Sequence, residues 1–249
     1  MSKIGVQNVV LGYMSELNAL RELASSIANE ELRRVVCSIL DNPLLSFTSV
    51  KPLITLEESP AAPRKHHFFK GGLAVHTLSV VKIALALSNV LSEVYGLEVN
   101  RDLVVATAIL HDIYKYYQYA QDTVYGGYKP REDWYLSHDY AVVAELARRG
   151  APEELIRAVS EVHGLVPFTT LEGLIVHLSD SVDARLGETL QNMVLNRVRD
   201  YEARNCQLYK ALNNIIENHG LKYVLRLVFN NPDELRELFE KECNARSSQ

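Results

Sequence analysis

An adjacent histidine and aspartate stand in an apolar stretch near the middle of the chain. Residues 108–117 read AILHDIYKYY, so that His111 and Asp112 directly follow an apolar run. A buried carboxylate is costly unless a cation or several hydrogen-bond donors compensate its charge. The pair is therefore either a core histidine satisfied by its neighbour or the centre of a metal site whose other ligands lie elsewhere in the sequence.

Further histidines and aspartates accompany the apolar segments. The candidate ligands, in chain order, are His76, His111, Asp112, His138, His163 and Asp180. Imidazole nitrogens and carboxylate oxygens suit divalent Mn, Fe, Co, Ni or Zn, whereas calcium prefers oxygen alone. Taken singly, each histidine is more simply explained as a hydrogen-bonded core residue. Only the combination favours a metal site.

The order of these residues resembles the H…HD…H…H…D pattern of the HD-domain metal-dependent phosphohydrolases, in the six-ligand form that holds two metals. The blocks HHFFKGGLAVHTLSV, AILHDIYK, LSHDYAVV, EVHG and HLSDSVDARL are similar to the HD domain of YhaM-type 3′-to-5′ exoribonucleases, over roughly residues 62–190. Those enzymes also carry an N-terminal nucleic-acid-binding OB domain, whereas the corresponding segment here is short and is predicted to be helical.

The resemblance implies one or two divalent transition metals per chain. The first metal is expected on His76, His111, Asp112 and Asp180. Asp112 is expected to bridge to a second metal, held by His138 and His163. Two cations about 3.5–4 Å apart neutralise phosphate charge and lower the pKa of a water between them. Asp112 is therefore predicted to be catalytic as well as a metal ligand.

Lys115 and Arg185 are predicted to contact substrate. Lys115 lies four residues after His111, and the HDxxK pattern of the relatives implies a catalytic, phosphate-binding or proton-donating lysine. The alternative is a lysine whose stem covers a helix end. Arg185 follows Asp180 in a DxxDAR block and could clamp a phosphate through two hydrogen bonds. Its alternative is a surface ion-pair network with Asp183.

His67 and a group of aromatic residues complete the candidate substrate contacts. His67 and its neighbour His66 precede a glycine pair, and one of them could touch substrate or act as a general acid; an exposed loop pair is the alternative. The run YKYYQYA, with Tyr125, Tyr128, Trp134 and Tyr135, is the densest aromatic region. Bases could stack on it, although aromatic residues at helical spacing usually belong to a core.

The elements that must position these residues are mostly helices. Apolar residues recur every three or four positions, which predicts an all-α fold: an HD-domain helical bundle with helical N- and C-terminal extensions. Helices are expected over 73–95, 101–119, 137–149, 152–163 and 171–186, with two more inside 6–42 and a helical tail over 188–245. Residues 43–72 should form a long surface loop, and residues 123–136 a turn or short hairpin.

This pattern predicts three parts. They are an N-terminal extension and loop over 1–60, the HD domain over 61–190, and a C-terminal extension packed on it over 191–249. His111 is expected inside the second half of the 101–119 helix.

Composition restricts the class of protein. The net charge of −5 and the absence of a long basic run argue against general electrostatic capture of nucleic acid. Cys37, Cys206 and Cys243 are odd in number and widely spaced, which argues against a disulfide framework and a thiolate zinc site, and favours a reducing, cytoplasmic location. No apolar run is expected to reach the ~20 residues that span a bilayer.

The predicted function is hydrolysis of a phosphomonoester or phosphodiester bond, in a nucleotide or an RNA 3′ end, through a metal-activated water. The expected partner is therefore a nucleotide or RNA and not a membrane, and a homo-oligomer is left open. Two alternatives stand beside this prediction. One is a nucleotide or nucleoside-triphosphate phosphohydrolase, which shares the ligands and differs in its pocket. The other is a regulatory module that binds a nucleotide without turning it over.

Overall fold

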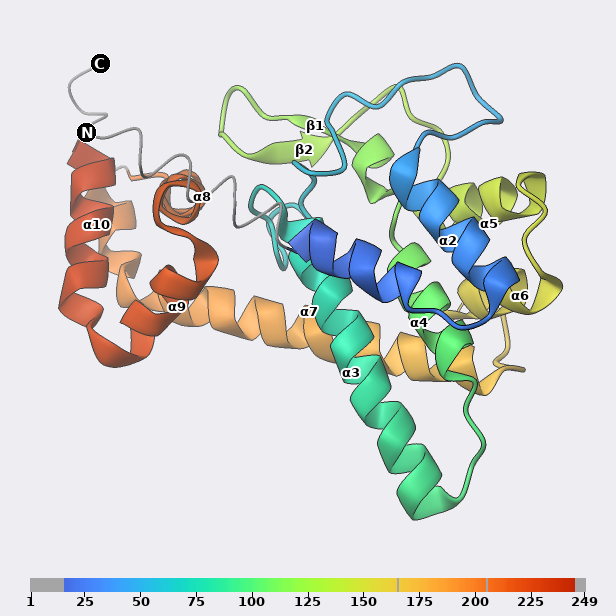
Figure 1. Cartoon of the computed structure of the whole chain (residues 1–249). Helices are drawn as coiled ribbons and strands as arrows, with labels where there is room; N and C mark the ends of the chain where they lie inside the picture. The colour runs from blue at the N-terminus through green and yellow to red at the C-terminus, as the bar shows by residue number, and fades with distance from the viewer. Residues whose placement is uncertain (1–15, 165, 205, 245–249) are drawn as a thin grey trace.

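Helices dominate the computed structural model, which describes residues 16–164, 166–204 and 206–244 (Figure 1). The α-helices, besides a helix over residues 16–25, are α2 Glu30–Asp41, α3 Gly72–Tyr95, α4 Arg101–Leu110, α5 His138–Arg148, α6 Glu153–Glu161, α7 Leu171–Arg197, α8 Leu208–His219, α9 Leu221–Asn230 and α10 Pro232–Asn244. Short 3₁₀ helices cover Lys115–Gln118 and Arg199–Arg204. The predicted all-α class is confirmed.

The N-terminal helices belong to the main hydrophobic core. α2 starts at Asn29, whose side chain accepts hydrogen bonds from the first turn, and it stops just before Pro43. Arg149, after α5, donates to the carbonyls of Ser38 and Asn42. The buried carboxylate of Glu145 accepts from the backbone N–H of Ser46. The two helices expected inside 6–42 are helix 16–25 and α2, while the earlier part of that range lies outside the described residues.

The loop over 43–71 and the hairpin after α4 have the predicted character. No α-helix or strand interrupts residues 43–71. β1 Tyr119–Gln121 pairs antiparallel with β2 Tyr128–Pro130, with Tyr119 opposite Pro130. The turn between them is fixed by Asp122, whose carboxylate accepts from the backbone N–H groups of Val124 and Tyr125. The aromatic region predicted as a turn or hairpin therefore forms one.

α3 begins and ends at glycines in the left-handed conformation, Gly71 and Gly96. It is long and apolar enough, by length and composition alone, to cross a membrane, so the expectation that no segment reaches this limit was wrong. The helix packs along α7 and α4, and His76 is one of its fully buried residues. Its buried residues lie mainly in its first half, whereas Val90, Val94 and Tyr95 near its end are exposed.

α4 is shorter than predicted. The apolar periodicity continues to residue 119, but the α-helix ends at Leu110, and His111 is its C-cap instead of an interior residue. Tight turns follow, in which the backbone N–H of Lys115 donates to the carbonyl of Asp112. His111 thus keeps a helical backbone at the end of α4, and the tighter turns begin directly after the histidine–aspartate pair.

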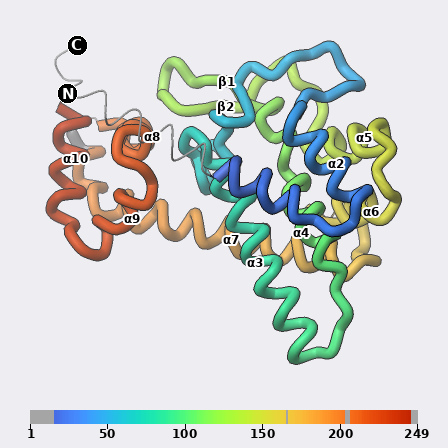
Figure 2. The backbone as a smooth tube through the Cα atoms, in the orientation of Figure 1, coloured from blue at the N-terminus to red at the C-terminus, as the bar shows by residue number. Residues whose placement is uncertain are grey.

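α7 is longer than predicted and connects two hydrophobic clusters. Figures 1 and 2 show it crossing behind α3 and reaching the group formed by α8, α9 and α10. The larger cluster contains the apolar residues of the N-terminal helices, α3 to α6 and the first part of α7. The smaller one contains Phe68, Phe69, the end of α7 and the C-terminal helices.

A disulfide joins Cys206 to Cys243, with a Cα–Cα distance of 5.3 Å, and Cys37 is free. The prediction against a disulfide was therefore wrong. The two cysteines are 37 residues apart in sequence, and only the packing of α10 beside the start of α8 brings them together. An odd count with wide spacing could not reveal this contact.

Candidate metal centre

Five segments of the chain converge on one buried cluster. His76 lies in the first turns of α3, and His138 is the first residue of α5. His111 and Asp112 follow α4 directly, His163 comes two residues after α6, and Asp180 lies in the middle of α7. Each ligand except Asp180 is thus near a helix end, where the backbone can turn its side chain toward a common point.

The first group surrounds one oxygen of Asp112. His76 Nε2 lies 3.2 Å from Asp112 Oδ2 and 3.1 Å from Asp180 Oδ1. His111 Nε2 lies 3.4 Å from the same Asp112 oxygen and 3.8 Å from Asp180 Oδ1. Each of the four residues offers an atom within 4.8 Å of the others, a spacing suited to one metal ion.

The second group surrounds the other oxygen. His138 Nε2 lies 3.1 Å and His163 Nε2 3.6 Å from Asp112 Oδ1. Asp112 therefore presents one oxygen to each group, which is the arrangement of a carboxylate that bridges two cations.

The candidate ligand atoms are spaced like atoms that share a bound cation, and most of them make no hydrogen bond. Atoms bonded to one ion at about 2.0–2.2 Å lie roughly 3.0–3.5 Å apart, close to the separations seen here. Within the described part of the chain, Asp112 Oδ1 and the Nε2 atoms of the four histidines are buried without a hydrogen-bond partner, while Asp112 Oδ2 has Lys115 Nζ as its ion-pair partner. Buried polar atoms are normally satisfied, so this concentration marks a site that could hold metal ions.

Hydrogen bonds on the far side of the rings orient two of the histidines. His76 Nδ1 lies 2.6 Å from the carboxylate of Asp183, and His111 Nδ1 lies 2.9 Å from the carbonyl of Ala108. A proton on Nδ1, donated to these acceptors, leaves Nε2 with a lone pair directed into the cluster. Asp183 is buried and therefore positions a ligand, a role that sequence reasoning missed.

The charges of the cluster match this assignment. Burial raises the pKa of Asp112, but Lys115 and His111 outweigh burial and hold that pKa well below its ordinary value. Burial lowers the pKa of His163 to about 4, so its imidazole is neutral and able to bind a metal at neutral pH. Burial also lowers the pKa of His76, but its three carboxylate neighbours outweigh burial and raise the value to about 10. Without a cation His76 would thus carry a proton on Nε2 as well, and a metal ion bound there would take the place of that proton beside the carboxylates.

Lys115 lies inside the cluster. Its Nζ is 2.5 Å from Asp112 Oδ2, and its side chain is mostly buried. Burial lowers the pKa of Lys115, but the Asp112 carboxylate outweighs burial, so the pKa is raised above its usual value. The ammonium group therefore stays charged beside the Asp112 carboxylate.

His67 lies directly behind His76. Its Nδ1 is 3.2 Å from that of His66 and 3.7 Å from Asp183 Oδ2. Its backbone has a positive φ of 47°, which is uncommon for a residue other than glycine. Its ring occupies the space beside Gly187, where an added Cβ would lie 2.3 Å from the ring. His67 is buried, while His66 is only partly so and is the more accessible of the two.

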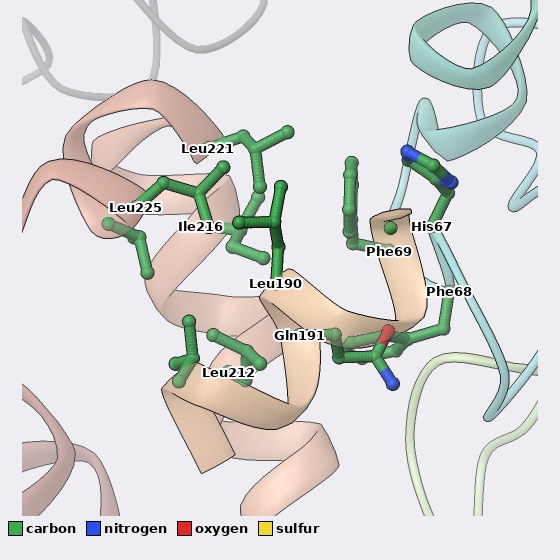
Figure 3. Close-up of a pocket in the computed structure, with 12 residues that line it drawn as sticks. His67, Phe68, Phe69, Leu190, Gln191, Leu212, Ile216, Leu221 and Leu225 are labelled. Atoms are coloured by element: carbon green, nitrogen blue, oxygen red, sulfur yellow. The ribbon is translucent and has the colours of Figure 1, made fainter. Parts of the chain in front are cut away.

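His67 also forms one end of a small apolar cavity between α7 and the C-terminal helices (Figure 3). Leucines of both parts face its interior. The volume of the cavity is about 50 Å³.

Arg185 is the predicted site residue that the structure does not bring to the cluster. Its guanidinium pairs with Glu188 on the same helix at 2.9 Å, and the side chain is 79% exposed. This geometry gives no support to a substrate-binding role, and a surface ion pair describes its position. The aromatic run after the HD pair is mainly core: Tyr114, Tyr116 and Tyr117 are buried, whereas Tyr125 and Tyr135 are exposed.

A second buried carboxylate, missed from the sequence, holds the segment that carries His163. Glu161 accepts hydrogen bonds from the backbone and hydroxyl groups of both Thr169 and Thr170. His177 supports the same segment by donating from Nδ1 to the carbonyl of Val162. Two threonines before an apolar helix start were the available signal, since such residues commonly cap helices.

Comparison with known proteins gives consistent matches. The family model for the HD domain matches residues 73–185. The chain is 39% identical over 201 residues to the dihydroneopterin 2′,3′-cyclic phosphate phosphodiesterase of Methanocaldococcus jannaschii, covering 79% of this chain and 80% of that protein.

More distant matches include 3′-5′ exoribonucleases YhaM. The protein of Shouchella clausii is 28% identical over 209 residues, which are 79% of this chain and 60% of that protein. The protein of Bacillus subtilis is 31% identical over 159 residues, which are 57% of this chain and 47% of that protein. The chain thus spans only about half of the length of these exoribonucleases. No solved structure matches.

Proposed function

The chain belongs to the HD-domain family of metal-dependent phosphohydrolases, and from this premise we propose that it opens the 2′,3′-cyclic phosphate of a small, heterocycle-bearing substrate. In this reaction a water oxygen bonds to phosphorus, one phosphorus–oxygen ester bond breaks, and the released ribose-type oxygen takes a proton. The product is a phosphomonoester.

The observation that carries the proposal is the position of Asp112. One of its oxygens faces His76, His111 and Asp180, and the other faces His138 and His163. We propose these six residues as ligands of two divalent cations. Two such cations, when bound, would neutralise the phosphate charge and lower the pKa of a bound water. The chain itself contributes the geometry, because buried hydrogen bonds fix the His76 and His111 rings before substrate arrives.

Lys115 is proposed to bind a phosphate oxygen. Its Nζ already contacts the bridging carboxylate, and its raised pKa keeps it a cation throughout the working pH range. A lysine with a raised pKa is a poor proton donor, so charge neutralisation is the better assignment for it.

We propose a small cyclic phosphate, and not an RNA 3′ end, as the substrate. The relative that acts on dihydroneopterin cyclic phosphate is matched over 80% of its length, whereas the exoribonucleases are matched over 47–60%. The matched region of the first relative is therefore nearly the whole protein. For the exoribonucleases, a large part of the molecule has no counterpart in this chain.

The test combines metal content with hydrolysis. The purified protein and its Asp112→Ala variant are analysed for bound metals, and both are assayed with bis(p-nitrophenyl) phosphate and a panel of nucleoside 2′,3′-cyclic phosphates in Mn²⁺. About two metals per chain and measurable hydrolysis are expected, both lost in the variant. The exposed Asp41→Ala serves as the matched control and should keep both. A protein that binds no metal and hydrolyses no diester contradicts the proposal, while cleavage restricted to RNA oligomers contradicts its substrate.

A further inference from the structure

An open pocket lies between three segments that are far apart in sequence. They are the tip of the β1–β2 hairpin, the loop around residues 63–68, and Glu202 of the second 3₁₀ helix together with the start of α8. The volume of the pocket is about 460 Å³, within the range of about 300–1,000 Å³ typical of small-molecule sites. The apolar cavity beside His67 has only about 50 Å³, too little for a bicyclic ring.

The walls of the pocket are fixed by direct contacts between the three segments. Phe68 packs edge-on against Tyr209 of α8, with ring centroids 5.2 Å apart. The stem of Lys210 crosses Gly126 at the hairpin tip so closely that an added Cβ would lie 2.7 Å from it. Gly126 has a φ of 75°, so the turn and the lysine both require glycine here. The pocket is thus part of the folded structure.

The lining combines planar rings with charges of both signs. Tyr125 is 59% exposed and Tyr209 37%, so both can offer ring surface to a ligand. Arg64 lies over the ring of Tyr125, 5.5 Å from its centre, and Lys210 adds a second cation. Glu202 supplies the one carboxylate among the described lining residues. Rings of this kind stack on heterocycles, and the cations attract an anionic substrate.

Two segments connect this pocket to the metal centre. Arg64 lies two residues before His66, so their Cα atoms are at most about 7 Å apart. The ring centroid of His66 is 5.2 Å from that of His76. From the other side, Lys115 leads within four residues into Tyr119, the start of β1. The loop before His66 and the hairpin after Lys115 therefore contribute residues both to the pocket and to the surroundings of the metal centre.

We propose that this pocket binds the heterocycle of the substrate, and that Glu202 selects a ring with an amino group beside a ring N–H, as pterins and guanine have. The two oxygens of a carboxylate can accept both hydrogen bonds of such an edge in parallel. Adenine lacks this pair of donors, and hypoxanthine keeps only the ring N–H. The inference rests on the proposed function, because it assigns the ring-binding part of the same site.

The test compares guanosine, inosine and adenosine 2′,3′-cyclic phosphates in Mn²⁺, with bis(p-nitrophenyl) phosphate as the substrate without a heterocycle. We expect kcat/KM to fall from guanosine to inosine to adenosine, by roughly tenfold or more overall. Glu202→Gln should reduce this preference to within about threefold. Tyr125→Ala should raise KM for all three nucleotides, because it removes stacking. The exposed Glu240→Gln, on α10, is the matched control and should change nothing.

The outcomes separate the two proposals. If the wild-type protein hydrolyses none of the probes, including bis(p-nitrophenyl) phosphate, the proposed function is overturned. Hydrolysis of every probe with equal efficiency for guanosine and adenosine overturns only the pocket assignment. A guanosine preference that survives Glu202→Gln shows that another group reads the ring, and it too overturns the role of Glu202. A KM effect of Tyr125→Ala that appears equally with bis(p-nitrophenyl) phosphate indicates general disruption and counts against the pocket.

Discussion

Asp183 is the residue whose contact explains most about the metal centre beyond the ligands. Its carboxylate accepts the Nδ1 proton of His76 and is itself buried, so it fixes both the tautomer and the rotation of that ring. Partners of this kind affect metal binding nearly as strongly as the ligands do, because a ring that can rotate or exchange its proton loses preorganised geometry.

We expect Asp183→Asn to weaken metal binding by roughly 10–100-fold while leaving the fold intact. The amide is nearly isosteric but carries no charge to hold the Nδ1 proton. Titration of the metal-free variant with Mn²⁺, followed by calorimetry, measures the change. Circular dichroism and thermal unfolding of the metal-free protein provide the control for folding. An unchanged affinity would mean that packing alone orients His76.

Glu161 makes the free energy of unfolding depend on pH in acidic solution. Burial raises its pKa, but hydrogen bonds from Thr169 and Thr170 outweigh burial, and the net pKa lies below its ordinary value of 4.5. A depressed pKa in the folded state means that Glu161 contributes stability above about pH 4.5. This contribution is lost as pH falls through the folded-state pKa.

Glu161→Gln should therefore lower the free energy of unfolding by about 1–3 kcal/mol at pH 7, and the difference should shrink below about pH 4. Denaturant unfolding of both proteins at several pH values checks this. Glu154→Gln, which removes an exposed carboxylate from the same helix, should have no comparable effect. A Glu161 difference that is constant with pH would assign the loss to packing and not to charge.

Among individual residues, the candidate ligands could be named from their types and order, and helix geometry explains where Asp183 and Arg185 lie relative to Asp180. Asp183 follows Asp180 by three residues, which places the two within about 60° around the helix, so both face the cluster. Arg185 follows by five residues and lies about 140° away, on the exposed side. This spacing can be read from the sequence alone, whereas the partners of each side chain cannot.

At the level of elements, apolar periodicity located most helices and failed at two ends. The 101–119 pattern remains apolar past Leu110 because the following turns and aromatic residues are also buried, and periodicity does not separate these states. α7 was predicted to stop at residue 186, before Gly187, yet it continues for eleven further residues to Arg197. The glycine there makes room for the ring of His67, a contact distant in sequence that no local signal records.

The disulfide holds the C-terminal helices together. It closes a separation of 37 residues between the start of α8 and α10. Chain-entropy arguments give about 3–4 kcal/mol of stabilisation for a closure of this length. We expect a reductant, or the double variant Cys206→Ser with Cys243→Ser, to lower the stability of these helices by that amount.

Denaturant unfolding with and without reductant measures the effect, and Cys37→Ser is the control because Cys37 is free. The number of free thiols in unfolded, unreduced protein provides a direct check. One thiol per chain agrees with the structure, while three thiols would show that the bond does not form.

Across the whole molecule, the two hydrophobic clusters do not follow the three parts expected from the sequence. The N-terminal helices share the larger cluster with the ligand-bearing helices, while Phe68 and Phe69, inside the predicted HD domain, belong to the smaller cluster. Long-range packing decides such membership, and sequence periodicity shows only which face of each helix is apolar. The boundaries near residues 60 and 190 remain predictions.

This division predicts two units of local stability. Leu32→Ala, in α2, should cost about 2–5 kcal/mol and increase amide exchange in α4 as well as in α2. Phe239→Ala, in α10, should cost about 3–5 kcal/mol and increase exchange in α8 to α10 while leaving α4 protected. Hydrogen exchange with mass spectrometry distinguishes the patterns. Uniform loss of protection in both variants would show that the molecule unfolds as one unit.

Because α7 is one continuous helix, it sets how the C-terminal helices are rotated about its axis relative to the helices around the metal centre. Asp180 lies in its middle, and its last turns end inside the C-terminal cluster. Each residue of a helix adds about 100° of rotation and 1.5 Å of rise. A single insertion after Gly187 would therefore leave the six ligands in register but turn α8 and the face it presents by about 100°. Helical phase, more than chain length, sets which insertions this protein can accommodate between the candidate metal centre and the C-terminal helices.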